Sequence, residues 1–214
     1  MGSEVIKPDV IKRRMWLEYQ YATTNPTGER LDCVHHLIND LADPKLDMHG
    51  FLQDAADTIR NKLGIKEVSI GLKSASDGKY RYEVMAGLHE DNWQAHKQLA
   101  YTYEEFFSQE VYKFMQISKY TRLYLAEDNP YDVDEEETFH RDVMLQSARK
   151  SLDDTIEGDY IDILILGKGE ELLGWLEISG MQNGKFPDGQ MIKSLELLAS
   201  VTAVALSLLK PCPA

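Results

Sequence analysis

Cysteine is scarce in this chain of 214 residues, which has two, Cys33 and Cys212. Two cysteines are too few for a disulfide framework, and Cys212 lies in a terminal Pro-Cys-Pro run where no structural role is expected. A chain of this length can bury a full core without disulfides. We therefore expect a reducing, cytoplasmic location.

Positive charge is also in short supply, with 23 Lys and Arg against 36 Asp and Glu and a formal net charge of −13. This charge repels phosphate backbones and anionic lipids, so we expect no nucleic-acid partner and no membrane docking. The most apolar run, residues 197–209, is shorter than the roughly 20 residues that span a membrane. Lys12, Arg13 and Arg14 interrupt any signal-peptide core.

Motifs of the common enzyme classes are missing from the sequence. There is no Gly-rich phosphate loop, no Ser-His-Asp order and no kinase motif set. No two titratable residues can be paired as acid and base in a pocket. We therefore expect that the chain is not an enzyme, leaving open that it is part of a longer sensor histidine kinase.

Hydrophobic spacing predicts two helices near the N-terminus. The first covers residues 8–21, and the second covers residues 29–41, with apolar residues three and four apart. Turn formers at 23–28 separate them, and Asp43-Pro44 ends the second. We assign residues 1–45 to an N-terminal helical extension and residues 46–210 to one domain.

Within residues 46–210 the pattern predicts a mixture of helices and strands. Helices are expected from Asp47 to Gly64, over most of 90–118, over 139–151 and from Phe186 to about Leu209. Strands are expected at 67–72, 79–86, 121–126, 160–167 and 172–179. An acidic loop follows at 127–137; it has the chemistry to bind a divalent cation, but a solvated loop is the favoured interpretation.

The C-terminal part resembles the closing pattern of GAF domains. A Gly-containing strand (173–178, Leu-Gly-Trp-Leu-Glu-Ile) leads to an aromatic-Pro-acid loop (Phe186-Pro187-Asp188) and then to a Leu- and Ala-rich helix (195–206). The resemblance covers residues 46–209. It implies an α+β fold with an antiparallel sheet of five or six strands. The first and last helices would lie on one face, residues 90–151 would cover the other, and two N-terminal helices would precede the domain.

The resemblance also implies a function, because GAF domains are mostly regulatory modules of signalling proteins. They bind small molecules between the sheet and the covering segment, or bind nothing and dimerise. We expect a sensory module that forms a homodimer through its terminal helices and binds a small molecule whose identity, like any cofactor, the sequence does not give. The alternative is a ligand-free dimerisation or interaction scaffold. Free methionine sulfoxide reductases share this fold, but the lack of cysteine between 34 and 211 argues against that chemistry.

An excess of aromatic residues in 90–124 suggests a pocket lined by rings, although core and surface packing is the plainer interpretation. Our candidates for its walls are aromatic residues from the covering segment and the sheet: Trp93, Tyr103, Phe107, Tyr124 and Trp175.

Three further patterns are similar to ligand motifs of the family. Residues 183–188 contain the Asn, Lys, Phe and acid of the cyclic-nucleotide signature, but the spacing is compressed, and a loop with a helix start is favoured. Cys33-Val34-His35-His36 suggests bilin attachment or a metal site, but a partly exposed helix is favoured. His96 and His140 are candidate haem ligands, although simple exposure is favoured.

Overall fold

The computed structural model describes residues 8–23, 25–129 and 149–209. Its helices and strands, in chain order, are α1 (Pro8–Thr23), α2 (Pro26–Asp40), α3 (Met48–Leu63), β1 (Ile65–Lys73), β2 (Tyr80–Ala86), α4 (Glu90–His96), α5 (Tyr103–Phe107), β3 (Met115–Gln116), β4 (Thr121–Tyr124), β5 (Tyr160–Leu166), the 3₁₀ turn η2 (Lys168–Glu170), β6 (Leu172–Met181) and α7 (Gly189–Leu208).

The six strands form one sheet in the order β2-β1-β6-β5-β4-β3, and every neighbouring pair is antiparallel. The expected hairpins β1–β2 and β5–β6 are both present. Gly78 in the first hairpin has φ +72°, a conformation that glycine adopts without strain.

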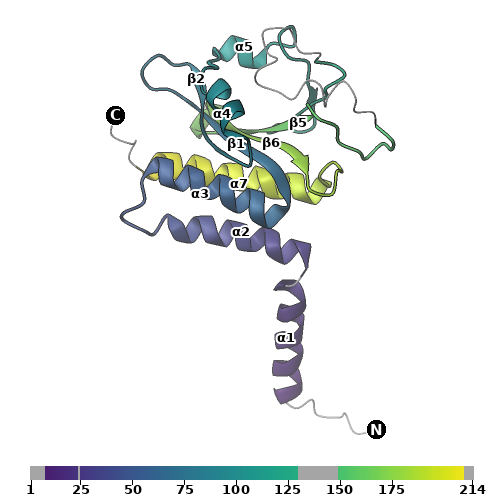
Figure 1. Ribbon diagram of the computed structural model, residues 1–214. Helices are drawn as coiled ribbons and strands as arrows, with labels where there is room; N and C mark the ends of the chain where they lie inside the picture. The colour runs from purple at the N-terminus through teal and green to yellow at the C-terminus, as the bar shows by residue number, and fades with distance from the viewer. Residues whose placement is uncertain (1–7, 24, 130–148, 210–214) are drawn as a thin grey trace.

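Helices cover both faces of this sheet, as expected (Figure 1). α3 and α7 pack on one face, and α4, α5 and their loops lie over the other. α3 begins where the Asp47 side chain accepts a hydrogen bond from the Gly50 amide, and it ends at Gly64 with φ +65°. The α+β, GAF-like architecture with two preceding helices is therefore confirmed.

The second N-terminal helix starts earlier than expected. The Asn25 side chain caps it by accepting from Gly28, and Pro26 occupies its first turn, so residues expected as a turn are helical. Cys33 and Leu37 join the core that α2 shares with α3 and α7, whereas Leu31 is half exposed. The division at residue 45 stays a prediction.

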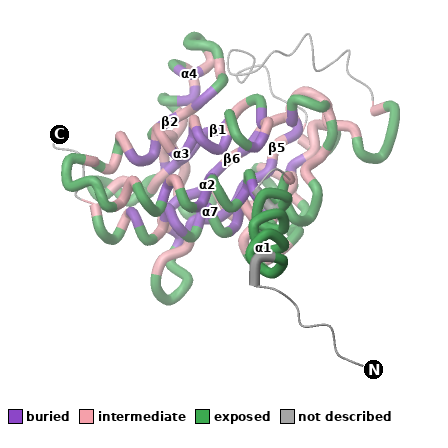
Figure 2. The backbone as a smooth tube through the Cα atoms, turned by 90° about the horizontal axis from the view of Figure 1, so that it is seen from below, coloured by how far each residue is buried: buried purple, intermediate pink, exposed green. Residues whose placement is uncertain are grey.

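α1 projects away from the rest of the molecule and touches α2 (Figure 1). Viewed from below, its turns are exposed along their described length (Figure 2).

Residues 90–118 were expected to be mostly helical, and this is wrong. Only the short helices α4 and α5 form there, and β3 follows. Thr102 and Glu105 start α5 by bonding each other's backbone amides, and Ser108 is already extended. The expected helix at 139–151 and most of the acidic loop lie outside the described residues; residues 149–151 are not helical.

α7 (Gly189–Leu208) agrees with the final helix expected from Phe186 to about Leu209. It has the length and composition of a helix that could cross a membrane, a test that buried core helices also pass. Here it packs against β5, β6, α2 and α3, and the side chains that face them are buried, Leu195, Leu198, Ala199 and Ala205 among them.

Candidate functional site

A row of polar residues crosses the face of the sheet that is turned away from α3 and α7, which we call the covered face. Arg122 on β4 is paired directly with Asp162 on β5, Asp162 with Glu177 on β6, and Glu177 with Ser69 on β1. Directly paired residues of antiparallel strands project to the same side, so these four side chains lie next to one another. We call them the polar row.

Hydrogen bonds connect the polar row to a tyrosine at one end. The Tyr82 hydroxyl donates to Glu177 Oε2 at 2.8 Å, and the Ser69 hydroxyl lies 3.4 Å from Glu177 Oε1. At the other end burial and the Asp162 charge raise the pKa of the Tyr124 hydroxyl, while Arg122 lowers it. The hydrogen bonds hold side chains of β1, β2 and β6 in one layer.

Arg122 is held by the covering segment as well as by the sheet. Its Nη1 donates to the backbone oxygen of Phe106 at 3.1 Å. Its guanidinium carbon lies 4.0 Å from the ring centre of Phe107 and 4.4 Å from that of Phe114. A planar cation between ring faces is favoured by the ring quadrupoles. The guanidinium is therefore fixed at the boundary between the two layers.

Among the residues that the structure describes, carboxyl groups outnumber buried guanidinium groups on this face. Burial, and then the charge of Glu177, raise the pKa of Asp162 well above its usual range, while Arg122 lowers it. Burial raises the pKa of Glu67, on the same face of β1, to about 7, with Glu157 and Glu177 contributing. Burial and Glu177 also raise the pKa of Tyr82. The covered face thus favours protonated, neutral groups.

Two atoms of the polar row are not satisfied. Arg122 Nε and Asp162 Oδ1 are buried and have no hydrogen-bond partner in the part of the chain that the structure describes. A buried polar atom without a partner costs about 1–3 kcal/mol, so such atoms are uncommon in folded proteins. A polar group that bonded to these two atoms would remove this cost, so they mark the part of the covered face where binding of such a group is most favourable.

Aromatic rings surround Trp175 beside the polar row. Its ring centre lies 5.1 Å from that of Tyr82, 5.0 Å from Phe106 and 6.2 Å from Tyr101. Gly71 makes room for it, because a Cβ there would lie 2.2 Å from the indole. A Cβ at Gly174 would lie 2.1 Å from the Gly71 oxygen, so this glycine permits the close approach of the neighbouring strand β1.

The five aromatic candidates are not all brought together. Trp175 lies in the buried aromatic cluster, and Phe107 packs against it. Tyr124 stacks on Tyr160 at 4.3 Å, at the far end of the polar row. Tyr103 stacks on Phe107 at 4.5 Å but is half exposed. Trp93, on α4, is buried under the ammonium group of Lys97.

The polar row was not predicted from the sequence. The one available signal was Asp162, a single acid inside the apolar strand Tyr-Ile-Asp-Ile-Leu-Ile-Leu. A buried strand rarely carries an acid without a partner or a function. Its neighbours Arg122 and Glu177 could be found only once the strand register was known.

Of the two candidate haem ligands, the structure describes one. His96 is buried, contrary to the exposure we favoured: its ring lies edge-on to Tyr82, and Nδ1 is 2.7 Å from the Asn92 oxygen. His140 lies outside the described residues.

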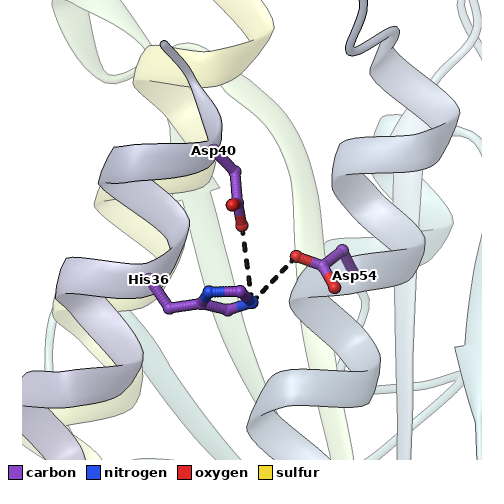
Figure 3. Close-up of side chains that lie close together, drawn as sticks. All are labelled: His36, Asp40 and Asp54. Carbon is purple, nitrogen blue, oxygen red and sulfur yellow. Dashed lines mark ion pairs between the residues drawn. The ribbon is translucent and has the colours of Figure 1, made fainter. Parts of the chain in front are cut away.

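The Cys33-Val34-His35-His36 segment is the partly exposed helix we favoured, since Cys33 and Val34 are buried, His35 is exposed and His36 is half-buried. Burial raises the pKa of the Cys33 thiol to about 11, which disfavours the thiolate needed for attachment chemistry. His36 points to Asp40 and Asp54 (Figure 3).

The residues similar to a cyclic-nucleotide signature serve the loop and the start of α7. Asn183 accepts from the Lys185 amide, and the Lys185 ammonium pairs with Asp154. Asp188 caps α7 and accepts from Arg30 at 3.1 Å. This agrees with the favoured interpretation.

A second polar cluster closes the end of the sheet near residue 149. Arg149 bonds Asp159 and Glu127, the latter at the start of the acidic loop, and lies over the ring of Phe186. A small hollow beside it is lined by Asp159, Tyr160, Ile161, Ile178, Phe186 and Pro187.

No protein-family model matches the sequence, and no curated protein matches it. Solved structures do match. The GAF domain of a phosphoenolpyruvate-protein phosphotransferase from Coxiella burnetii has a TM-score of 0.55 and 16% identity, covering 86% of this chain and 95% of that chain. The GAF domain of a putative sensor histidine kinase from Pseudomonas syringae has a TM-score of 0.51 and 12% identity, and the match covers 90% of this chain and 92% of that chain.

A bacteriophytochrome, RpBphP3 of R. palustris, has a TM-score of 0.53 and 15% identity, covering 87% of this chain and 38% of that chain. Identities this low report on fold alone. The antiparallel sheet, the helices on both faces and these likenesses together show that the protein has the GAF fold.

Proposed function

We propose that this protein is a sensory GAF module of a signalling system that binds a small molecule on the covered face of its sheet. The observation that carries the proposal is the polar row, with Arg122 Nε and Asp162 Oδ1 buried and unpaired in the described part of the chain. A ligand that bonds to these atoms offsets a cost that the folded protein otherwise bears.

The chemistry of the face narrows the class of ligand. In the described part of the chain this face carries one buried guanidinium and three carboxyl groups, those of Asp162, Glu177 and Glu67. This balance of charge disfavours anions such as nucleotides. Trp175 and Tyr82 offer ring surfaces. A planar, neutral or cationic molecule with both hydrogen-bond donors and acceptors fits best.

The solved structures support a sensory role by fold alone, since domains of this fold occur in a putative sensor histidine kinase and a bacteriophytochrome. We infer that this chain is regulatory, with catalysis carried by another protein or domain, and that it works in the cytoplasm.

Output through a homodimer follows from exposed apolar side chains on the terminal helices. On α1, Met15 and Trp16 are more than half exposed, and so are Val204 and Leu208 on α7. Pairing of these helices with a second copy would bury them, and ligand binding would shift the equilibrium between two packings. Light scattering tests this: a strict monomer at high concentration contradicts it.

A ligand-free scaffold is the second candidate, and the aromatic cluster favours it. Trp175 is 1% exposed, with Tyr82, Tyr101 and Phe106 around it, so side chains fill much of the layer. In that case the fold serves dimerisation or protein interaction only.

Native mass spectrometry of the full chain purified from its own host separates the two candidates. We expect a noncovalent small molecule that is retained by the wild type and by Arg81→Met, an exposed arginine paired with Asp77, and lost from Arg122→Met. Glu177→Gln, which keeps the side-chain volume, should weaken retention while folding normally. Protein that carries no adduct and gains no thermal stability from a library of planar amides and amines supports the scaffold.

A further inference from the structure

A histidine and two aspartates converge between α2 and α3 (Figure 3). His36 and Asp40 lie one turn apart on α2, and Asp54 faces them from α3. The His36 Nε2 atom is 3.2 Å from Asp54 Oδ2 and 3.5 Å from Asp40 Oδ2. One nitrogen and two oxygens thus lie within 4.8 Å of one another.

These separations match the geometry of ligands around a metal ion. Zinc binds imidazole nitrogen and carboxylate oxygen at about 2.0–2.2 Å, which places tetrahedral ligands roughly 3.3–3.5 Å apart. A direct charge-assisted N–H···O bond is shorter, about 2.7–2.9 Å. The three atoms are therefore spaced to hold an ion between them.

The electrostatics of the cluster favour a cation for an independent reason. Asp40 Oδ2 is buried and has no hydrogen-bond partner among the residues that the structure describes. One imidazole nitrogen, His36 Nε2, faces an oxygen of each of two neighbouring carboxyl groups at 3.2 and 3.5 Å. A divalent ion between them would relieve the repulsion of the two carboxylates and supply the partner that Asp40 Oδ2 lacks.

We propose that His36, Asp40 and Asp54 form a site for a divalent transition-metal ion of the zinc class. Imidazole with carboxylates suits zinc and its neighbours, whereas Mg²⁺ and Ca²⁺ take oxygen ligands alone. The side chains are 40%, 28% and 43% exposed, which leaves a fourth position for water and a route for the ion.

The site goes beyond the proposed ligand pocket because it lies on the other side of the sheet, among the helices. A bound ion joins α2 to α3 and so fixes the helix from which α1 projects (Figure 1). Metal availability would then act on the proposed dimerisation helix independently of any ligand on the covered face.

The test measures Zn²⁺ binding to the full chain by calorimetry after chelator treatment, with the variants His36→Gln and Asp54→Asn. His35→Gln is the matched control, since His35 is the exposed neighbour on the same helix. We expect the wild type and the control to bind one equivalent of Zn²⁺. The dissociation constant should rise more than about 100-fold in both site variants, which exceeds the effect of changing a residue that only hydrogen-bonds a ligand. Ca²⁺ should not compete.

A second readout guards against variants that simply misfold. Without metal, Asp54→Asn should raise the melting temperature, because it removes one of two repelling carboxylates. When Zn²⁺ is added, the melting temperature of the wild type and of the control should rise, and that of Asp54→Asn should not. Any of four results would overturn the proposal. The wild type binds no Zn²⁺; His36→Gln still binds it; His35→Gln loses binding as much as the site variants; or Ca²⁺ competes as well as Zn²⁺.

Discussion

The two faces of the sheet are built from different side chains. Towards α3 and α7 the central strands present aliphatic residues, Ile161, Ile163, Ile165, Leu176 and Ile178, all in one continuous core. On the covered face the same two strands present Asp162, Leu164, Trp175 and Glu177. The first face stabilises the fold by close apolar packing. The second face contributes less stability, because part of its area is occupied by polar groups held in fixed positions.

The buried polar groups that belong to the sheet itself differ in how well they are paired on its two faces. On the helix face, the Thr121 hydroxyl donates to Glu196 of α7 at 2.9 Å, and Glu196 also pairs with Lys193 at 2.7 Å. On the covered face, Arg122 and Asp162 each keep one unpaired buried atom among the described residues; the other two such atoms, Arg30 Nε and Asp40 Oδ2, belong to α2, which packs on α3 and α7. We infer that the helix face of the sheet is complete as a structural contact, whereas the covered face is suited to accept another molecule.

The largest expected effect comes from the helix face. Ile163→Ala removes a fully buried side chain and should lower the free energy of unfolding by about 3 kcal/mol. Urea denaturation measures this, with Leu31→Ala, a half-exposed leucine, as the control. The near-UV circular dichroism of the Trp175 cluster should stay unchanged at low denaturant. A cost below 1 kcal/mol would contradict the division between the faces.

The next effect tests the close packing of the covered face. Gly71→Ala places a methyl group against the Trp175 ring and should destabilise the protein by about 2 kcal/mol. Combining it with Trp175→Leu should cost less than the sum of the two single changes, since the smaller side chain makes room. Strict additivity would show that the two residues do not restrict each other.

Most of the architecture could be predicted from sequence because it follows from periodic burial. Both hairpins, α3 and α7 were expected near their observed bounds. The start of α2 was missed because Asn25-Pro26 looks like a turn but caps a helix. Residues 90–118 were wrongly assigned as mostly helical on the basis of their bulky aromatic residues. Thr102 and Ser108 are the N-cap and C-cap of α5, so the helix between them is short.

The candidate site was predictable only in part, because it depends on register. Trp175 and Tyr124 were expected as pocket walls from composition, yet the polar row between them joins Arg122, Asp162 and Glu177 from three strands. The spacing of His36 and Asp40 was visible along α2, but Asp54 meets them only through helix packing.

A smaller effect comes from the centre of the polar row. Asp162→Asn should stabilise the protein by about 1 kcal/mol at pH 7, because burial and Glu177 raise the pKa of the carboxyl and ionising it in the fold is unfavourable. The gain should fade as the pH falls through 3.8, the ordinary aspartate pKa, and should be nearly gone at about pH 3, where Asp162 is protonated in the unfolded chain as well. Unfolding by urea at both pH values measures this. A loss of stability at pH 7 would mean that the Arg122 charge keeps Asp162 ionised.

The smallest effect concerns Glu67, at the edge of the same face. Its pKa is raised from 4.5 to about 7, so the folded state holds this proton more tightly than the unfolded state. The stability that this group contributes is complete below pH 4.5 and is lost as the pH rises through 7. Glu67→Gln should therefore match the wild type at pH 4 and exceed it by roughly 0.5 kcal/mol at pH 8, a figure kept small because the carboxyl is partly exposed. Glu110→Gln, at an exposed position, is the control. If the free energy of unfolding of Glu67→Gln and of the wild type changed in parallel with pH, the pKa of Glu67 would not be raised by burial at the edge of the covered face.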